Sequence, residues 1–396
     1  MSQRLRIGYV TTGSASDVNN WSGLVLHIRE ALRGAGNEIH DIDNLAVNIP
    51  VRTRLRGWYQ RFVRGRIYGY HYDLDLARSF ARAVEARLAK LSLDCLVSPG
   101  SYAFAMLRTN LPCASWGDAT FHALFTYYPW FDRFSEVSVE HAHDLQRRSL
   151  RQCVLNCYPA QWAADDALTY YGAAPASVAV VPYGANCDPA FVSEMDAMSA
   201  IRGRILSPLR LLFVGGDWER KGGPLALRVL SELQRRGIDA ELWVVGCQPF
   251  DGVPPDGVRC LGFLSKSDPC HKRQWELCFR QCHVFLLPTK ADCFGVVYAE
   301  AASYALPSLA TRTGGVPDAA KEGQNGWLFD PCADETGYAD LLESWVRDDD
   351  MYHDAAMRAW RYGDAVLNWH AAGQRFSDLL LEKVEHAKNL STSIGR

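Results

Sequence analysis

Two successive rounds of one pattern, short apolar runs alternating with amphipathic segments, constrain the fold more than any other feature of the chain. In the first round Leu24–Leu32 has helical spacing, and the runs expected to be strands are Arg6–Val10, Asp94–Val97, Val154–Cys157 and Val178–Val181. Strand–loop–helix alternation of this kind is typical of α/β folds with parallel sheets. We therefore expect a first α/β domain over residues 1–195.

The pattern restarts after residue 200. A helix is expected after Pro224, and the new strands are expected at Leu209–Val214, Leu242–Val245, Val258–Leu261 and Val284–Leu287. The intervening stretch Glu194–Pro208 has no clean strand pattern and is interpreted as the linker. A second α/β domain is thus predicted over 205–365. A C-terminal helix is predicted within 366–396 from an apolar stripe of Trp369, Phe376, Leu379 and Leu380.

Length and composition are those of a globular protein. The chain has 396 residues, enough for two or three domains. Its formal net charge of −3 argues against a protein that coats nucleic acid by charge, so no nucleic-acid partner is expected. The N-terminus, Met1–Val10, lacks the apolar stretch of a signal peptide, and no run approaches the roughly 18–20 apolar residues of a membrane span. We expect a soluble, cytoplasmic protein.

The chain has 12 cysteines but no CxxC pair. The nearest spacings are Cys153/Cys157 and Cys278/Cys282, and His283 follows the second pair. Two ligands at four-residue spacing on a helix need a second pair to hold zinc. Because no signal peptide is visible, we expect reduced and mainly buried thiols, and no metal site.

Pro288–Pro317 is the stretch that says most about function. The strand Val284–Leu287 leads into a loop and then into a helix, and the polar or conformationally special residues there are Lys290, Asp292, Phe294, Gly295 and Glu300. Ligands of open α/β sheets bind at the carboxyl ends of strands, and a helix N-terminus favours an anion. Glu300 has apolar neighbours, where a carboxylate needs a partner such as a ribose hydroxyl. A surface position on the outer face of the helix is an equal alternative.

Lys221 lies in a second stretch of the same kind. It follows the strand Leu209–Val214 and precedes a helix, with glycines at 215, 216, 222 and 223 around it. An ammonium group at this point can reach a diphosphate. A solvated loop lysine is the commoner fate of any single Lys, and the glycines favour the binding role.

Taken in order, these motifs resemble the C-terminal half of the GT-B retaining glycosyltransferases of family four (glycosyl transferases group 1). They are Phe213-Val-Gly-Gly-Asp-Trp-Glu-Arg-Lys-Gly-Gly, Asp292-Cys-Phe-Gly-Val-Val-Tyr-Ala-Glu300, Gly314-Gly-Val-Pro-Asp318 and Gly323-Gln-Asn-Gly326. In the first half, Trp21-Ser-Gly23, Trp116-Gly-Asp118 and Val181-Pro-Tyr-Gly-Ala-Asn186 resemble the acceptor-side domain and the lead into its linker. The resemblance covers nearly the whole chain, and the ordered set is specific although each piece alone is weak.

The resemblance implies a GT-B fold, in which two Rossmann-like domains with parallel sheets face each other across a cleft and the C-terminal helix crosses back to the first domain. It implies transfer of a hexosyl group from a nucleotide-diphosphate sugar to an acceptor hydroxyl, with retention of the anomeric configuration. UDP- and GDP-sugars are the foremost donor candidates, and neither a metal nor a tightly bound cofactor is implied. The acceptor stays open between a glycan, a lipid-linked compound and a small metabolite.

The resemblance also implies roles for single residues. Lys221 would hold the donor diphosphate, above a loop that contains Gly215 and Gly216. Glu300 would bind the ribose, and Asp292 would contact the hydroxyls of the transferred sugar. The backbone at Phe294 and Gly295 would face the distal phosphate, while Ser22 and Gly23 would lie across the cleft near the diphosphate.

Three positions depart from the family pattern. The first carboxylate of the EX7E pair is Asp292, which is one methylene shorter than Glu. Gly216 stands where Arg is frequent, and Arg220 can compensate at the diphosphate. Asp118 stands where His is frequent near the sugar, and it can orient a hydroxyl or the acceptor. The implied catalytic residues are thus Asp292, Asp118 and Lys221.

These departures keep two alternatives open. One is a GT-B relative with other chemistry, such as a sugar-nucleotide epimerase or an enzyme that forms a non-glycosidic bond. The other is a catalytically silent module that binds a nucleotide sugar.

The segment between Asn44 and Tyr72 has no acidic residue but six arginines, at positions 52, 54, 56, 61, 64 and 66, interleaved with aromatic residues. A peripheral membrane contact through Arg52–Arg66 is one expectation, and a phosphorylated or lipid-linked acceptor is another. A solvated loop and helix face is the alternative. Asp73-Leu-Asp75 resembles the DxD metal motif of a different glycosyltransferase fold, but it opens the predicted helix Leu74–Leu88, so we expect helix N-terminal charge there.

Overall fold

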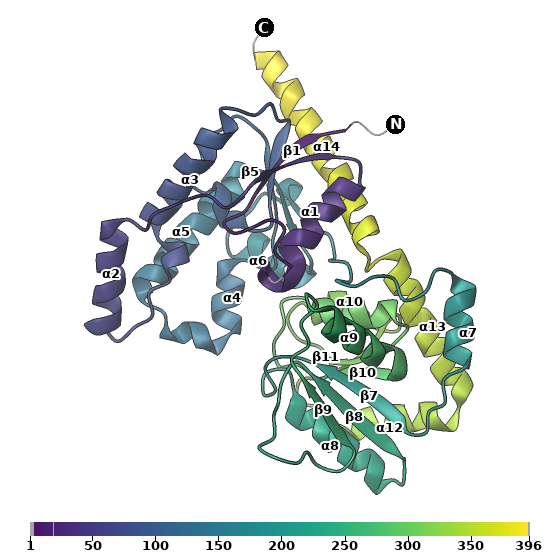
Figure 1. Cartoon of the computed structure of the whole chain (residues 1–396). Coiled ribbons are helices and arrows are strands. Elements are labelled where there is room, and N and C mark those ends of the chain that lie inside the picture. Colours follow the sequence, from purple (N-terminus) through teal and green to yellow (C-terminus); the bar gives the residue numbers. More distant parts are fainter. Residues whose placement is uncertain (1–3, 19, 395–396) are drawn as a thin grey trace. The chain divides into compact units, whose positions relative to one another are not determined.

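The computed structural model describes residues 4–18 and 20–394, which form two compact units (Figure 1). The first unit comprises Met1–Val181 and Ala372–Arg396, and the second comprises Pro182–Ala371. Each unit is built on a six-stranded sheet in which all the observed pairings are parallel. The predicted α/β class with two parallel sheets is therefore confirmed. The domain limits 1–195, 205–365 and 366–396 stay a prediction.

The sheet of the first unit has the strand order β2-β1-β3-β4-β5-β6. Its strands are β1 (Arg6–Val10), β2 (Glu38–Ile42), β3 (Cys95–Ser98), β4 (Cys113–Trp116), β5 (Cys153–Tyr158) and β6 (Val178–Val180). The helices are α1 (Leu24–Gly34), α2 (Val51–Phe62), α3 (Leu74–Leu88), α4 (Phe121–Tyr127), α5 (Glu136–Gln152) and α6 (Gln161–Thr169). The central strands β3 and β4 are buried along their whole length, as expected for a parallel sheet covered on both faces.

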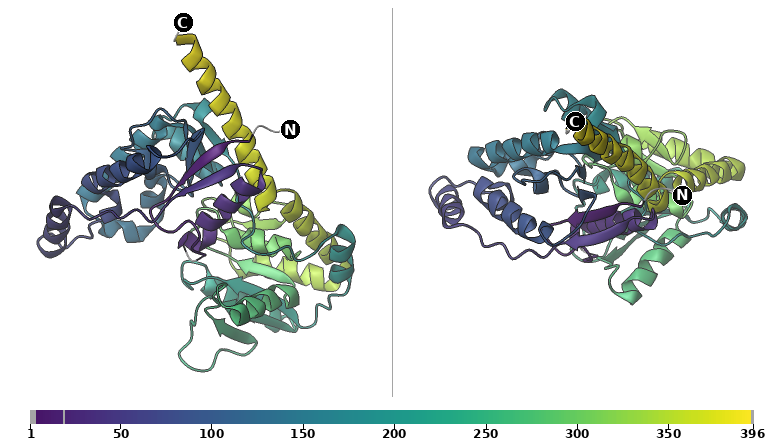
Figure 2. Two further views of the ribbon diagram at one scale, coloured as in Figure 1. Left: turned by 45° about the horizontal axis from the view of Figure 1, so that its top comes forward. Right: turned by 90° about the horizontal axis from the view of Figure 1, so that it is seen from above.

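The C-terminal helix α14 (Trp369–Ile394) belongs to the first unit from Ala372 onward. Figures 1 and 2 show it beside α1, and Gly373 makes this approach possible, because a Cβ there would lie 2.4 Å from the carbonyl oxygen of Ala31. The ring of Phe376 stacks on Trp116, with 4.8 Å between centroids. The expected return of this helix to the first domain is thus confirmed.

The sheet of the second unit has the order β12-β11-β10-β7-β8-β9. Its strands are β7 (Leu209–Val214), β8 (Ala240–Val245), β9 (Val258–Gly262), β10 (Val284–Leu287), β11 (Ser308–Thr311) and β12 (Gly326–Phe329). The helices are α7 (Glu194–Arg202), α8 (Gly223–Arg235), α9 (Pro269–Gln281), α10 (Val296–Ser303), α11 (Val316–Ala319), α12 (Glu335–Arg347) and α13 (Asp349–Ala365). The chain enters the sheet at β7, adds β8 and β9 on one side, and then returns to add β10 on the other side of β7. The order in which strands are added therefore reverses between β7 and β10.

Several expectations on local structure can be compared directly with the molecule. Asp73 caps α3 by accepting hydrogen bonds from the backbone of Asp75 and Leu76, which confirms the expected helix N-terminal charge. The stretch Glu194–Pro208, interpreted as a linker, contains α7, whose apolar face is narrow because only Ala197 and Ile201 are buried. The 12 cysteines are free thiols. Among the residues that the structure describes, no helix is long and apolar enough to cross a membrane.

Candidate functional site

The candidate site lies in the second unit, where β7 and β10 end side by side. Ligands of open α/β sheets bind at the carboxyl ends of the strands, at the point where the strand order reverses. The loops that leave the two strands are joined by hydrogen bonds there: Lys290 N donates to the Arg220 carbonyl (2.8 Å), and Gly315 N, from the loop after β11, donates to the Asp292 carbonyl (3.1 Å). The three loops therefore form one connected surface.

Lys221 and Asp292 form an ion pair at the centre of this surface. The ammonium Nζ of Lys221 donates to Oδ2 of Asp292, although the residues are 71 positions apart in the chain. Their side chains are only 13% and 14% exposed. A solvated loop lysine is therefore not what the structure shows, and the two residues predicted separately lie in contact.

Three glycines allow the loops to close around this pair. A Cβ at Gly215 would lie 2.9 Å from Cγ of Lys221, and one at Gly222, where φ is +82°, would lie 1.9 Å from the Pro288 carbonyl oxygen. Gly295 has φ +86° and begins α10, and a Cβ there would lie 3.2 Å from Oδ2 of Asp292. L-residues rarely adopt such positive φ angles, so positions 222 and 295 require glycine for their backbone conformation, whereas position 215 requires it for space.

Gly216 and Arg220 bear on the departure from the family pattern. A Cβ at Gly216 would have only the Gly246 carbonyl oxygen within 4 Å, at 3.9 Å, so the fold leaves room for a larger side chain there. The guanidinium of Arg220 donates to the Ala291 carbonyl (2.7 Å) and to Oδ2 of Asp217 (3.3 Å). Arg220 thus braces the two loops beside Lys221, and its role at a diphosphate stays a prediction.

Phe294 and Glu300 flank the start of α10. The Phe294 side chain is buried, and its ring meets Tyr183 edge-on with centroids 5.6 Å apart, so only its backbone can face a ligand. Glu300 is 5% exposed, which excludes the alternative of a surface carboxylate.

Lys266 is the partner of Glu300, and sequence reasoning missed it. Its Nζ donates to Oε1 of Glu300 and to the Asn186 carbonyl (3.0 Å), and lies 4.1 Å from the centroid of the Trp275 ring. Lys266 belongs to the polar loop that follows β9. A polar loop after a predicted strand is the signal that could have singled it out, but nothing in the sequence links it to Glu300.

The predicted residues Asp118, Ser22 and Gly23 belong to the first unit, and the structure places each of them after a strand. Asp118 follows β4 after one residue. Ser22 and Gly23 lie in the turn after β1 that begins α1, with φ of +55° and +85°. The backbone strain of a non-glycine residue at positive φ is typical of functional turns. Asp118 thus stands at the carboxyl end of β4, while Ser22 and Gly23 end the segment that connects β1 to α1.

The acidic pair Asp73 and Asp75 has a structural role. Asp73 is buried and accepts hydrogen bonds from Thr53 Oγ1 (2.6 Å), Arg56 Nη1 (3.0 Å) and Tyr68 OH. Although burial raises the pKa of Asp73, these hydrogen bonds lower it to about 2. Within residues 4–18 and 20–394, no group of three or more His, Cys, Asp or Glu side chains is arranged to hold a metal.

Comparison with known proteins finds similarity in the part of the chain that contains the candidate site. Residues 208–348 match the family model described as glycosyl transferases group 1. The D-inositol 3-phosphate glycosyltransferase of Corynebacterium diphtheriae is 27% identical over 227 residues, 54% of this chain and 53% of its own length. The GDP-mannose-dependent alpha-(1-6)-phosphatidylinositol monomannoside mannosyltransferase of Mycolicibacterium smegmatis is 29% identical over 174 residues, 41% of this chain and 44% of its own. The chain thus spans about half the length of the curated relatives it matches.

Among solved structures, sucrose-phosphate synthase from Thermosynechococcus elongatus superposes with a TM-score of 0.67 at 14% identity, over 96% of this chain and 99% of its own. Similarity at this level shows the fold alone. The fold is that of the GT-B glycosyltransferases, and the resemblance seen in the sequence is confirmed.

Proposed function

We propose that this chain, in which residues 208–348 match the group 1 glycosyltransferases, moves a hexosyl group from a nucleoside diphosphate sugar to an acceptor hydroxyl. The observation that carries the proposal is the Lys221–Asp292 ion pair at the reversal point of the second sheet. A nucleoside diphosphate sugar fits this pair, because the cation can bind its diphosphate and the carboxylate can accept hydrogen bonds from its sugar hydroxyls. The relatives named for glycosyl and mannosyl transfer support the same reaction.

The donor would exchange the ion pair for contacts of its own. Its diphosphate takes the ammonium of Lys221, supported by Arg220, and its sugar hydroxyls donate to Asp292. The phosphates lie over Gly215 and Gly216 and meet the backbone of residues 294–295 at the start of α10, where the helix N-terminus favours negative charge. Ribose hydroxyls donate to Glu300.

The transfer follows from stabilising the leaving group. The bond between the anomeric carbon and the phosphate oxygen breaks, and the acceptor oxygen bonds to the same face of that carbon, which retains its configuration. The acceptor proton passes to the departing phosphate, whose charge Lys221 and Arg220 neutralise. Asp118 orients a sugar hydroxyl or the acceptor, and Ser22 and Gly23 contribute to diphosphate binding. No metal takes part in this scheme.

The acceptor is proposed to be a glycan, a lipid-linked compound or a small metabolite. D-inositol 3-phosphate is the first compound to test, because a relative is named for it. A cytoplasmic site of action is part of the proposal, since thiols stay reduced there and the 12 cysteines are free.

Product analysis tests the proposal. The purified protein is incubated with UDP- and GDP-sugars and candidate acceptors, with and without EDTA, and the anomeric configuration of the product is read by NMR. We expect a retained glycoside that forms equally in EDTA. Lys221→Ala and Asp292→Asn should lower kcat/KM by roughly 100-fold or more, while Lys290→Ala, a control at a 66% exposed lysine of the same loop, should not. An isomerised donor, a non-glycosidic product, or nucleotide binding without turnover would replace this proposal with one of its alternatives, and an inverted product would contradict retention.

A further inference from the structure

Helix α2 carries an apolar stripe on its outer side. Val51, Leu55, Trp58 and Phe62 recur at the i, i+4, i+7, i+11 spacing that places side chains on one helix face. These side chains are 71%, 62%, 58% and 67% exposed. An exposed apolar row of this kind marks an interaction surface rather than a core.

The opposite face of α2 fixes this orientation. Thr53 and Gly57 are the buried residues of the helix. Thr53 donates to Asp73 at the start of α3, and a Cβ at Gly57 would lie 2.0 Å from the hydroxyl oxygen of Tyr70. Figure 1 shows α2 at the outer edge of the first unit. The apolar stripe therefore points away from the body of its own unit.

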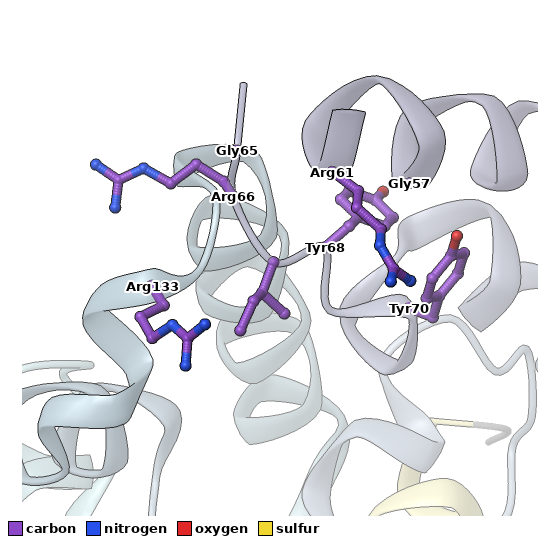
Figure 3. Close-up of a pocket in the computed structure, with 8 residues that line it drawn as sticks. Gly57, Arg61, Gly65, Arg66, Tyr68, Tyr70 and Arg133 are labelled. Carbon is purple, nitrogen blue, oxygen red and sulfur yellow. The ribbon is translucent and has the colours of Figure 1, made fainter. Parts of the chain in front are cut away.

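Arginines border the stripe on both sides. Arg52 lies on one side of the stripe, and Arg54 and Arg61 lie on the other. Residues 45–71 contain no Asp or Glu that could neutralise them. Beside α2 is a cavity of about 380 Å³ lined by Arg61, Arg66, Arg133 and Tyr70, among others. In Figure 3 the Arg61 side chain lies beside Tyr70, the Arg133 side chain lies on the opposite side of the view, and Arg66 points away from both.

We propose that α2 docks on an anionic phospholipid surface. Its apolar stripe enters the boundary between headgroups and acyl chains, and the flanking arginines meet lipid phosphates. Arg61 and Arg133, which both line the cavity beside α2, meet lipid phosphates there. A second copy of this chain is a poor occupant, because a symmetric contact through α2 would set its arginines against each other. The inference does not rest on the proposed function, since none of the residues of α2 or of its cavity takes part in the proposed transfer.

Vesicle flotation tests the proposal with the full chain. Phosphatidylcholine vesicles, with or without one-third phosphatidylglycerol, are mixed with protein at about 0.1 M and 0.5 M NaCl. We expect binding only to the anionic vesicles, and weaker binding at high salt. Trp58→Ser/Phe62→Ser should lower the partition coefficient about tenfold or more, and Arg61→Gln/Arg133→Gln roughly 30-fold.

Two matched controls separate this surface from general effects. Val253→Ser/Phe263→Ser removes exposed apolar side chains from the second unit, and Arg82→Gln/Arg87→Gln removes two exposed arginines from α3. Neither should change flotation. Unchanged melting temperatures and nucleotide affinities show that the α2 variants are folded.

Three results would overturn the inference. The wild-type protein does not float with anionic vesicles, it floats equally with neutral ones, or the control pairs lose as much binding as the α2 pairs. Self-association that depends on Trp58 and Phe62, measured by sedimentation, with no vesicle binding, would assign the stripe to a second copy.

Discussion

The Lys266–Glu300 pair makes a sharp prediction about stability, because its two members are buried to different depths. The Glu300 side chain is 7% exposed and that of Lys266 is 34% exposed. Removing one partner of a buried pair costs about 3–5 kcal/mol when the remaining charge stays buried and uncompensated. Lys266→Met leaves the Glu300 carboxylate buried and without a compensating charge. Glu300→Gln instead leaves the Lys266 ammonium group, which can turn to water.

The magnitudes follow from this asymmetry. We expect Lys266→Met to cost about 3 kcal/mol, the low end of the range because water reaches the pair from the lysine side. Glu300→Gln should cost about 1 kcal/mol, the value of an ordinary hydrogen bond. The double variant Lys266→Met/Glu300→Gln buries no charge, so it should be more stable than Lys266→Met alone.

Calorimetric melting of the wild-type protein and the three variants measures this. For a unit of this size, about 1 kcal/mol shifts the melting temperature by roughly 2–4 °C. Lys266→Met should therefore lower it by roughly 6–12 °C, and adding Glu300→Gln should restore part of the loss. Additive losses, or a larger effect for Glu300→Gln than for Lys266→Met, would contradict an uncompensated buried charge at Glu300.

Three further predictions each concern a single residue. Burial lowers the pKa of His283 from 6.5 to about 3, so the unfolded chain gains a proton first as pH falls below 6.5 and the fold loses about 2 kcal/mol by about pH 5. His283→Asn should flatten the decline of melting temperature between about pH 7 and 5, and an unchanged slope contradicts this. Burial raises the pKa of Asp73, but hydrogen bonds from Thr53 and others lower it to about 2, so its contribution is present above 3.8 and is lost as pH falls toward 2. Asp73→Asn should therefore cost about 2 kcal/mol in urea unfolding at neutral pH and little near pH 2, and equal losses at both would count against it. Gly222→Ala should abolish nucleotide binding in calorimetry because its Cβ meets a carbonyl oxygen at 1.9 Å, whereas Gly237→Ala, at φ +79° with open space, should not, and equal behaviour would contradict the loop geometry.

The elements that could be predicted from the sequence are those whose local pattern fits only one kind of secondary structure. The strands Arg6–Val10, Leu209–Val214 and Val284–Leu287 have the predicted bounds because short, mainly apolar runs of this length are typical of buried parallel strands. The helix Leu74–Leu88 also has its predicted bounds, since Asp73 caps it. By contrast, α7 was missed because two buried side chains are too few to mark a helical period.

The candidate site could be predicted only in part, for the same physical reason. Lys221, Asp292 and Glu300 stand out by their loops and neighbours. Their contacts depend on strand order, which local patterns do not contain. Lys266 lies 34 positions before Glu300, and only the parallel order of the sheet brings the loop after β9 to α10.

Calorimetric titration measures whether the second unit binds a nucleoside diphosphate through Lys221 and Glu300. UDP, GDP, ADP and TDP are titrated into the wild-type protein, Lys221→Ala, Glu300→Ala and the exposed-lysine control Lys290→Ala. We expect that one nucleotide binds clearly and that the first two substitutions each weaken its binding by about 1.5–3 kcal/mol, roughly 10- to 150-fold in Kd, while the control keeps wild-type affinity. If no nucleotide binds, or if neither substitution changes nucleotide affinity, the donor-site assignment is wrong, and so is the proposed glycosyl transfer.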